Sequence, residues 1–291
     1  MKDLHIHMSG GRKDSPKEFK EKCLAAGVDG GAVFSLCPQM IRPEPGEDQR
    51  WQARMEQILE FTSGAEGFLP IFYIDPTEID AMKQIEAAAE YGFAGFKIIC
   101  SHFLPGNILL PLCSMAETGL PVLFHSGILY DERCSSRNNR PIEFECLMDV
   151  PNLHFSMAHV SWPWCDELIA LCGKFNHLDE AMPGRRSRMH FDITPGTPPI
   201  FRRDALFKIF LSGYPVEKRV IWGTDNVANN YNIDYARYWA NLDRGIIGEI
   251  AQNAESFRCP GCPERKFNSL WEAVSENNFQ RFFGKQEGGA A

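Results

Sequence analysis

The stretch Asp3-Leu4-His5-Ile6-His7, at the beginning of the chain, decides how the rest of the sequence is interpreted. Leu4 and Ile6 alternate with Asp3, His5 and His7, which predicts a β-strand with one apolar face and one polar face. Two histidines at positions i and i+2 share a strand face, so both imidazoles can bind one divalent cation. Two histidines near the start of a chain can also simply be exposed. The metal interpretation therefore depends on whether the rest of the chain supplies further ligands.

The composition is that of a protein with a large buried core. The chain has 291 residues, of which 44% are apolar and 23% charged, and this length is typical of a single α/β barrel domain. A net charge of -8 disfavours a nucleic-acid-binding or polybasic membrane-binding surface, because both need clustered Lys and Arg. No apolar run approaches the roughly 20 residues of a membrane span, and no apolar signal segment begins the chain. We therefore expect a cytoplasmic protein that acts on a small molecule, without nucleic-acid or membrane partners.

The ten cysteines are scattered, and several, such as Cys100, lie in apolar contexts. This distribution predicts free thiols in a reducing compartment and no disulfide framework. Cys259 and Cys262 form a Cys-x-x-Cys motif, which can be half of a zinc site or a redox pair. No second pair lies nearby, so we expect free thiols in a tight turn. A site shared between two copies of the chain stays open as an alternative.

Short apolar runs alternate with helix-like stretches along the whole chain. The expected strands span residues 3–7, 31–36, 68–74, 94–99, 121–125, 153–159, 189–193 and 220–225. The expected helices span residues 16–26, 48–61, 78–90, 109–117, 141–147, 164–175 and 204–211, with a charged loop at 179–188 and two or three further helices within 233–283. Ser15 and Glu18 form a capping box at the start of the first helix, and Pro16 lies in its first turn.

Eight successive strand–helix units predict a (β/α)8 TIM barrel, an α/β fold whose parallel strands are buried on both faces. A doubly wound open sheet is the alternative, but no glycine-rich phosphate-binding turn follows the first strand. No change in composition suggests a linker. We expect one barrel domain over residues 1–285, closed by C-terminal helices, and a disordered tail over 286–291.

Candidate catalytic side chains follow four of the expected strands. His5 and His7 end the first strand, His125 the fifth, His159 the sixth and Asp225 the eighth. Barrel enzymes carry their catalytic groups at the carboxyl ends of the strands, so these residues should meet on one rim. A single buried polar residue at a strand end can be a hydrogen-bonding core residue, but four such ends are hard to explain in that way. Imidazoles with one carboxylate suit a catalytic Zn²⁺ or a similar divalent ion.

The chain resembles the amidohydrolase superfamily of metal-dependent barrel hydrolases. It is most similar to the amidohydrolase 2 branch, which also contains amino-carboxymuconate-semialdehyde decarboxylase and related nonoxidative decarboxylases. The matching segments are DLHIH at 3–7, PVLFHSG at 121–127, MAHVS at 157–161, WGTDN at 222–226 and ENNFQRFFG at 276–284. Each segment alone is weakly specific, and their order along nearly the whole chain makes the resemblance strong. Related members often form dimers, so the resemblance also implies a homodimer.

The resemblance implies that His5, His7, His125 and Asp225 bind one divalent metal ion, Zn²⁺ or Mn²⁺. It further implies that Asp225 accepts a proton from the attacking water. His159 would lie beside the metal and polarise the substrate or hold the nucleophile. A bound divalent ion lowers the pKa of its water towards neutrality and polarises a carbonyl as a Lewis acid.

Lys97, on the expected fourth strand, decides the number of metal ions. In binuclear members of the superfamily a carboxylated lysine on this strand bridges two metals, so carboxylation of Lys97 would imply two ions. We favour a single metal, because a buried lysine can equally be the charge partner of a substrate or a carboxylate. His102 is expected to be an exposed loop residue. The remaining histidines, His154, His177 and His190, are expected to be structural.

The polar loop after the fifth expected strand should overhang the site. Arg133, Arg137 or Arg140 could clamp a substrate carboxylate, because a guanidinium pairs with it in a bidentate manner. A charged loop can also be merely solvated. Trp162, after the sixth strand, could line the pocket or belong to the packing.

These features predict a metal-dependent hydrolase of an amide, lactone or ester bond in a small molecule, with or without a carboxylate. A metal-dependent nonoxidative decarboxylase would use the same ligands, so the motifs do not separate the two reactions. A metal-binding protein without catalytic activity is the third hypothesis. The intact set of ligands disfavours it, because a non-catalytic site has no need for both His159 and Asp225.

Overall fold

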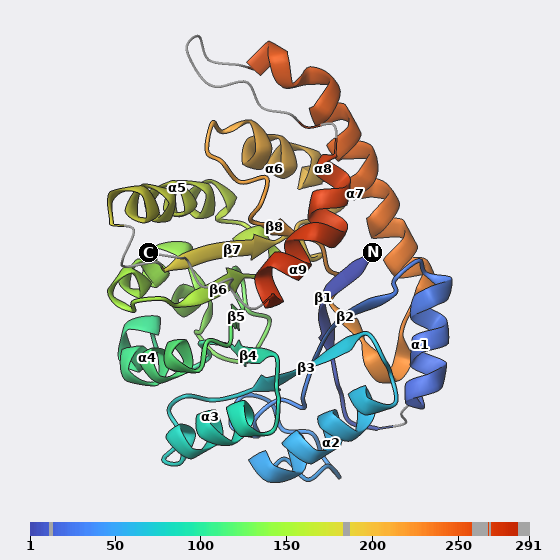
Figure 1. Cartoon of the computed structure of the whole chain (residues 1–291), viewed down its shortest axis with the longest axis vertical. Coiled ribbons are helices and arrows are strands. Elements are labelled where there is room, and N and C mark those ends of the chain that lie inside the picture. The colour runs from blue at the N-terminus through green and yellow to red at the C-terminus, as the bar shows by residue number, and fades with distance from the viewer. Residues whose placement is uncertain (12–13, 183–186, 258–266, 268, 285–291) are drawn as a thin grey trace.

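The computed structural model describes residues 1–11, 14–182, 187–257, 267 and 269–284 of the chain. Its parallel strands form one curled sheet, surrounded by helices, which confirms the predicted α/β barrel (Figure 1). The strand order in this sheet is β8-β7-β6-β5-β4-β3-β2-β1-β9. The strands are β1 Lys2–His7, β2 Gly30–Phe34, β3 Phe68–Tyr73, β4 Gly95–Ile98, β5 Val122–Phe124, β6 His154–Met157, β7 Arg188–Asp192, β8 Val220–Ile221 and β9 Asn226–Val227.

The barrel closes where the chain bends within the predicted eighth strand. Residues 220–225 do not form one strand: β8 pairs with β7, and β9 pairs with β1. Between them the backbone amide of Leu4 donates to the carbonyl of Trp222 at 3.1 Å, which joins the two sides of the sheet. Asp225 has a positive φ of 59°, so the backbone leaves the extended conformation immediately before β9. This bend presents the Asp225 side chain at the rim.

Strand β1 carries a β-bulge between Asp3 and Ile6, where its register against β2 shifts. Leu4 packs in an apolar cluster with helix α9 (Asn278–Phe283), whereas Ile6 packs in the large cluster that includes residues of the outer helices. The prediction that Leu4 and Ile6 share one face is therefore wrong. A bulge adds one residue to one strand, and the alternation of side chains changes at that point.

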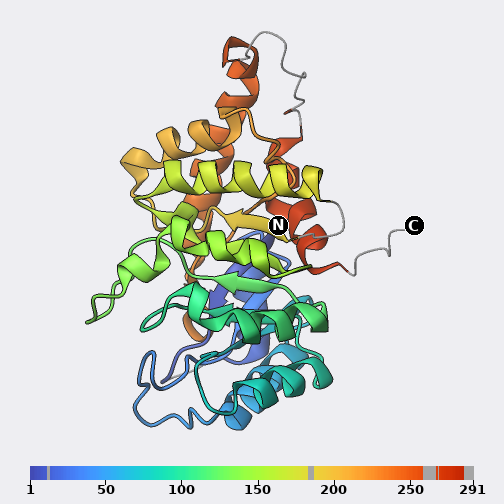
Figure 2. The same cartoon turned by 90° about the vertical axis from the view of Figure 1, so that its left-hand side faces the viewer.

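The helices lie outside the strands. They are α1 Pro16–Ala25, α2 Trp51–Ser63, α3 Ala81–Glu90, α4 Leu109–Thr118, α5 Cys165–Ala181, α6 Pro199–Leu211, α7 Ile233–Asn253, α8 Leu270–Glu272 and α9 Asn278–Phe283. The 3-10 helices are η1 Pro105–Ile108, η2 Ser136–Asn139, η3 Pro141–Asp149, η4 His159–Ser161, η5 Ala228–Asn230 and η6 Ala254–Phe257, and η7 Ala273–Asn277 is a π-helix. One end of α7 projects beyond the barrel in both views (Figures 1 and 2).

Several predicted boundaries are corrected. The predicted helix at 141–147 is the 3-10 helix η3, and α5 continues past its predicted end at residue 175 into the first three residues of the predicted charged loop. Helix α6 begins at Pro199, before the predicted start at residue 204, because proline is well suited to the first turn of a helix. The capping box of Ser15 and Glu18 is confirmed at the start of α1.

Helix α9 closes the end of the barrel at which the strands begin. Phe279 and Phe282 pack in one cluster with Leu4, and the ring of Phe282 lies 4.8 Å from that of His154 and 5.2 Å from that of His190, between ring centroids. Because apolar side chains close this end, polar chemistry is confined to the opposite rim, where the strands end.

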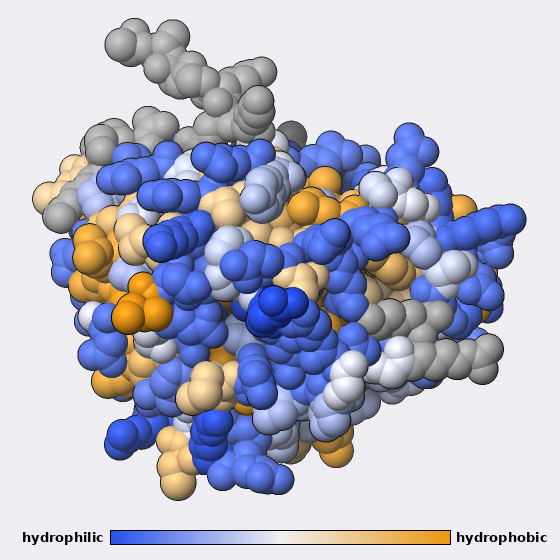
Figure 3. All heavy atoms as spheres, turned by 90° about the horizontal axis from the view of Figure 1, so that it is seen from below, coloured by the Kyte–Doolittle hydropathy of each residue, from blue (hydrophilic) through white to orange (hydrophobic). Residues whose placement is uncertain are grey.

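On the face shown in Figure 3, hydrophilic residues predominate and apolar residues form smaller groups between them. Among the helices that the structure describes, none has both the length and the apolarity to cross a membrane. The eight cysteines within the described residues are all free thiols. Cys259 and Cys262 lie outside the described residues, as does the predicted tail at 286–291.

Candidate metal centre

Strand β1 brings two imidazoles to the carboxyl-terminal rim of the barrel. The Nε2 atoms of His5 and His7 lie 3.1 Å apart. The Oδ1 atom of Asp225 lies 3.6 Å from Nε2 of His5 and 3.3 Å from Nε2 of His7. Two ring nitrogens and one carboxylate oxygen, from opposite ends of the sequence, therefore converge on one point.

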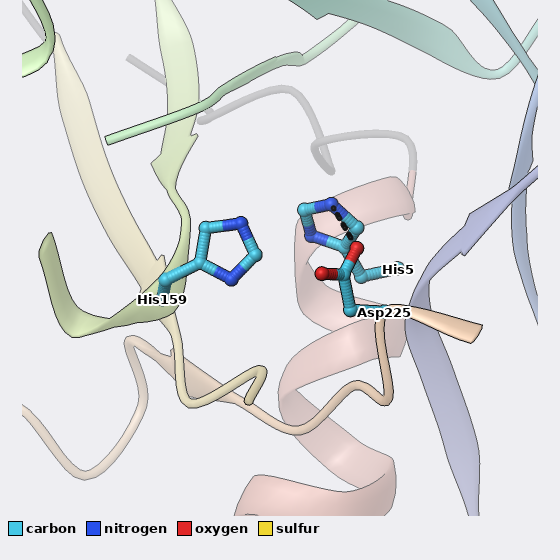
Figure 4. Close-up of side chains that lie close together, drawn as sticks. All are labelled: His5, His159 and Asp225. Atoms are coloured by element: carbon cyan, nitrogen blue, oxygen red, sulfur yellow. Dashed lines mark ion pairs between the residues drawn. The ribbon is translucent and has the colours of Figure 1, made fainter. Parts of the chain in front are cut away.

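His159, which follows β6, faces the same point. His5, His159 and Asp225 can each direct one ligand atom so that these atoms lie within 4.8 Å of one another. Figure 4 shows the three side chains pointing towards a common space. The Nδ1 atom of His159 is buried and has no hydrogen-bond partner within the described part of the chain. A buried polar atom without a partner is costly, so a ligand there would satisfy it.

The loop that carries His159 has an unusual backbone. His159, Val160 and Ser161 have φ values of 60°, 51° and 52°, in the left-handed region that residues other than glycine seldom adopt. Such conformations cost of order 1–3 kcal/mol each and are found mainly where neighbouring contacts enforce them. Here the Ser161 hydroxyl donates to that of Ser126 at 2.8 Å, and the Ser126 hydroxyl donates to a backbone carbonyl. The strain therefore coincides with the candidate site.

His125 lies beside His159, outside the triplet that His5, His159 and Asp225 form. Its ring centroid is 5.0 Å from that of His159, and its Nε2 atom is 3.3 Å from the backbone carbonyl of Ile128. Four histidines, from β1 and from the ends of β5 and β6, thus come together within the barrel rim. The prediction that His125 rather than His159 is a metal ligand stays a prediction.

The protonation states suit ligands of a metal ion. Burial holds the pKa of His5 well below its ordinary value, and the charge of Lys97 and the neighbouring histidines add to the effect. Burial likewise holds the pKa of His125 well below its ordinary value, and it lowers that of His7, against the opposing charge of Asp225. Desolvation raises the pKa of Asp225, but the hydrogen bond with His7 and nearby positive charges outweigh it and lower that pKa. Neutral imidazoles and an ionised carboxylate are the forms that bind metal.

Lys97 is fully buried on β4, and its Nζ atom lies 3.4 Å from Nε2 of His5. The amine also lies 5.1 Å from the centre of the Phe34 ring. Burial lowers the pKa of Lys97 to about 8, while Asp192 and Asp225 oppose this shift. The strand thus places Lys97 in the candidate site, as the sequence suggested.

Two buried carboxylates support the site, and sequence reasoning assigned a role to neither. Asp192, at the end of β7, lies with Oδ2 3.3 Å from Nδ1 of His5. Asp3 accepts hydrogen bonds from Thr224 and Tyr231, and burial raises its pKa to about 6 despite these bonds. The position of Asp192 at a strand end, like that of Asp225, is the signal that could have identified it.

The donor set fits a divalent ion. Ring nitrogens of His5, His7 and His125 and a carboxylate oxygen of Asp225 are the ligand types found in zinc sites, and 36% of the Asp225 side chain is exposed, which leaves access from solvent. The bond between His5 and Asp192 resembles the carboxylate–histidine pairs that orient metal ligands. These residues would therefore hold the ion.

Two of the three arginines predicted to clamp a substrate carboxylate already contact other parts of the protein. Arg133 donates to the backbone carbonyl of Met40 at 2.8 Å, which ties its loop to the loop after β2. Arg140 pairs with Glu167 at 2.8 Å and lies over the ring of Trp164, and Arg137 is exposed. Trp162 stacks on Phe201 with ring centroids 5.0 Å apart. Arg133 and Arg140 already have protein partners, so a role in binding substrate stays a prediction.

The other histidines lie away from the triplet. His154 and His190 are buried with Nε2 of the first 3.2 Å from Nδ1 of the second, in agreement with a structural role. His177 is not a buried structural residue: it lies exposed on α5. His102 is partly exposed and contacts Ser101, Thr77 and Asp75.

Fold and site together define a closed parallel α/β barrel with a candidate divalent-metal centre at the carboxyl ends of its strands. A model of the amidohydrolase family matches residues 39–249, which is more than half of the chain. The chain belongs to the amidohydrolase family. This membership supports an enzyme of the general hydrolase class.

Solved structures show the same fold over nearly the whole chain. An amidohydrolase from Burkholderia multivorans with bound HEPES is 11% identical, with a TM-score of 0.59 over 97% of this chain and 98% of that one. A protein from Pseudomonas putida named as a candidate 2-pyrone-4,6-dicarboxylic acid hydrolase is 14% identical, with a TM-score of 0.54 over 97% of each chain. Dihydroorotase from Campylobacter jejuni is 16% identical, with a TM-score of 0.54 over 98% and 83%. No curated protein sequence matches the chain. At these identities the structures establish the fold alone.

Proposed function

We propose that this protein is a mononuclear metal-dependent hydrolase that cleaves an amide, lactone or ester bond of a small carboxylated molecule. The observation that carries the proposal is the convergence of His5, His159 and Asp225 at the open rim, together with the unpartnered Nδ1 atom of His159. Membership of the amidohydrolase family supports the general hydrolase chemistry.

In this proposal the ring nitrogens of His5, His7 and His125 and the carboxylate of Asp225 hold the ion. When bound, a divalent ion would make water a stronger nucleophile at neutral pH and polarise the carbonyl of the substrate. The Asp225 carboxylate is partly exposed to the opening, so it can accept the proton of an attacking water. Nδ1 of His159, which has no partner in the described structure, can hydrogen-bond the carbonyl oxygen or the water.

Lys97 offers a buried cation for a substrate carboxylate. Its amine lies beside His5 and over the ring of Phe34, which is the mixed cationic and apolar environment that suits a small carboxylated substrate. If Lys97 were instead carboxylated, it would bridge a second ion. The metal content of the protein distinguishes these two roles.

The test is metal content per chain by elemental analysis, followed by a substrate screen. Tag-free wild type should contain about one zinc or manganese ion, and the variant His5→Ala/His7→Ala should lose it, because removing both β1 imidazoles leaves too few ligands. His177→Ala, at an exposed histidine on α5, is the matched control and should keep the ion. Two ions per chain would contradict the mononuclear site, and no ion after reconstitution would refute the metal-dependent function.

Metal-loaded wild type is then assayed on lactones, amides and esters that carry a carboxylate, with Asp225→Ala as the inactive variant. Release of carbon dioxide from aromatic carboxylates, measured in parallel, would indicate the nonoxidative decarboxylase instead, since that reaction would use the same ligands. Equal turnover by wild type and Asp225→Ala would contradict both enzymatic functions.

A further inference from the structure

Asp192 connects two residues of the site that are far apart in the sequence. It ends β7, and its side chain is almost completely buried. One carboxylate oxygen, Oδ2, lies 3.3 Å from Nδ1 of His5. The other, Oδ1, accepts hydrogen bonds from the backbone amides of His159 at 2.9 Å and Thr194 at 3.0 Å.

The contact with His5 determines which ring nitrogen carries the proton. An ionised carboxylate only accepts hydrogen bonds, so a neutral His5 that bonds Asp192 must carry its proton on Nδ1. Its Nε2 atom then presents a lone pair to the cluster in which His7 and Asp225 lie. That lone pair is what a metal ion requires.

The contact with His159 supports the left-handed loop. The amide of His159 would otherwise be a buried donor in a loop of three consecutive residues with positive φ. Asp192 pairs this amide and fixes the first residue of the loop, from which the imidazole projects towards His5. The ring centroids of His5 and His159 lie 5.0 Å apart.

We propose that Asp192 is the positioning residue of the metal centre, which fixes the ring of His5 and the loop of His159 as one unit. This inference rests on the proposed function only in its last step, where the aligned nitrogens serve a metal ion. The tautomer of His5 and the protection of the His159 amide are properties of the metal-free protein.

The variant Asp192→Asn separates the two contacts. The amide oxygen of asparagine can still accept from the amides of His159 and Thr194, whereas its NH₂ group faces Nδ1 of His5 and donates to it. His5 should therefore change tautomer and place its proton on Nε2, in the position of the metal. Asp192→Ala removes both contacts, so it should also release the loop.

Three readouts test the proposal. In two-bond ¹H–¹⁵N spectra of the metal-free protein, His5 should carry its proton on Nδ1 in wild type and on Nε2 in Asp192→Asn. Hydrogen exchange of the His159 amide should be slow in wild type and Asp192→Asn and faster in Asp192→Ala. The affinity for Zn²⁺, measured by competition with a chromophoric chelator, should fall by about 10- to 100-fold in Asp192→Asn. Asp166→Asn, at an exposed aspartate on α5, is the control and should bind Zn²⁺ as wild type does.

A wild-type His5 that carries its proton on Nε2 would overturn the proposal, and this measurement needs no variant to fold. Unchanged Zn²⁺ affinity in a folded Asp192→Asn would also overturn it. If wild type neither binds Zn²⁺ nor hydrolyses any substrate, the proposed function fails. The tautomer and exchange measurements would still decide the role of Asp192 in that case.

Discussion

The buried pair of His154 and His190 should make the protein unstable to acid. Burial lowers the pKa of His154 to about 3 and holds that of His190 well below its ordinary value, and the charges of Arg188 and Arg219 act in the same direction. The ring of Phe282 from α9 covers both imidazoles. His154 stays neutral in the folded state at pH 5, and His190 resists protonation in the same way, whereas both are protonated on unfolding once the pH falls below about 6.5.

The sign and size of this loss of stability follow from proton linkage. The folded-state pKa is depressed, so the unfolded state binds more protons and the free energy of unfolding falls as the pH decreases through 6.5. For His154 the loss between pH 7 and pH 5 is about 2 kcal/mol, and His190 adds to the loss in the same direction.

The assay is urea denaturation at pH 7 and pH 5, followed by tryptophan fluorescence, on wild type and on His154→Gln/His190→Gln. The double variant should lose at least about 2 kcal/mol less between these pH values than wild type, although it is less stable at pH 7, because glutamine does not titrate. His177→Gln, at an exposed position, should lose as much as wild type. The reasoning is refuted if the double variant and wild type lose equal stability between pH 7 and pH 5.

Two further predictions concern packing. Arg202 and Asp243 form a fully buried bidentate ion pair between α6 and α7. Arg202→Met should lower the free energy of unfolding by about 3–5 kcal/mol, because it leaves the Asp243 carboxylate buried without its partner. The neighbouring exposed pair of Arg203 and Glu249 is the control, and Arg203→Met should cost about 0–1 kcal/mol; equal losses in the two variants would contradict the argument. A Cβ atom on Gly196 would lie 2.8 Å from Cβ of His159, so Gly196→Ala should destabilise the protein by about 1–3 kcal/mol and weaken Zn²⁺ binding. Gly248→Ala, where a Cβ meets no atom within 4 Å, should do neither, and a thermal melt with and without Zn²⁺ compares the two.

Much of the fold was predictable because it depends on local patterns. Short apolar runs separated by helix-like segments indicated the parallel barrel, and Ser15 with Glu18 indicated the start of α1. The boundaries that failed have local causes that the pattern hides. Residues 141–147 are apolar enough for a helix but form a 3-10 helix. The predicted eighth strand ends as β8 at Ile221, and the chain bends at Asp225 before β9 pairs with β1.

The candidate site was predictable in its residue types but not in its connections. Histidines and an aspartate at strand ends point to a common rim, because parallel strands in a barrel all end there. The sequence does not show that Asp192 bonds His5, since 187 positions separate the two residues. Nor does it show that His159 begins a left-handed loop, because valine and serine favour no such conformation by themselves.

The sequence by itself determined the barrel and the set of polar residues at the ends of its strands, because apolar runs that alternate with helix-like segments give the order of strands and helices. The tertiary structure alone decided the β-bulge in β1, the split of the last strand, the orphaned Nδ1 of His159 and the buried carboxylate of Asp192. Each of these depends on contacts between segments that are distant in the chain. Such contacts compete with local preference, because a buried polar group left without a partner costs about 1–3 kcal/mol, as much as a strained backbone residue.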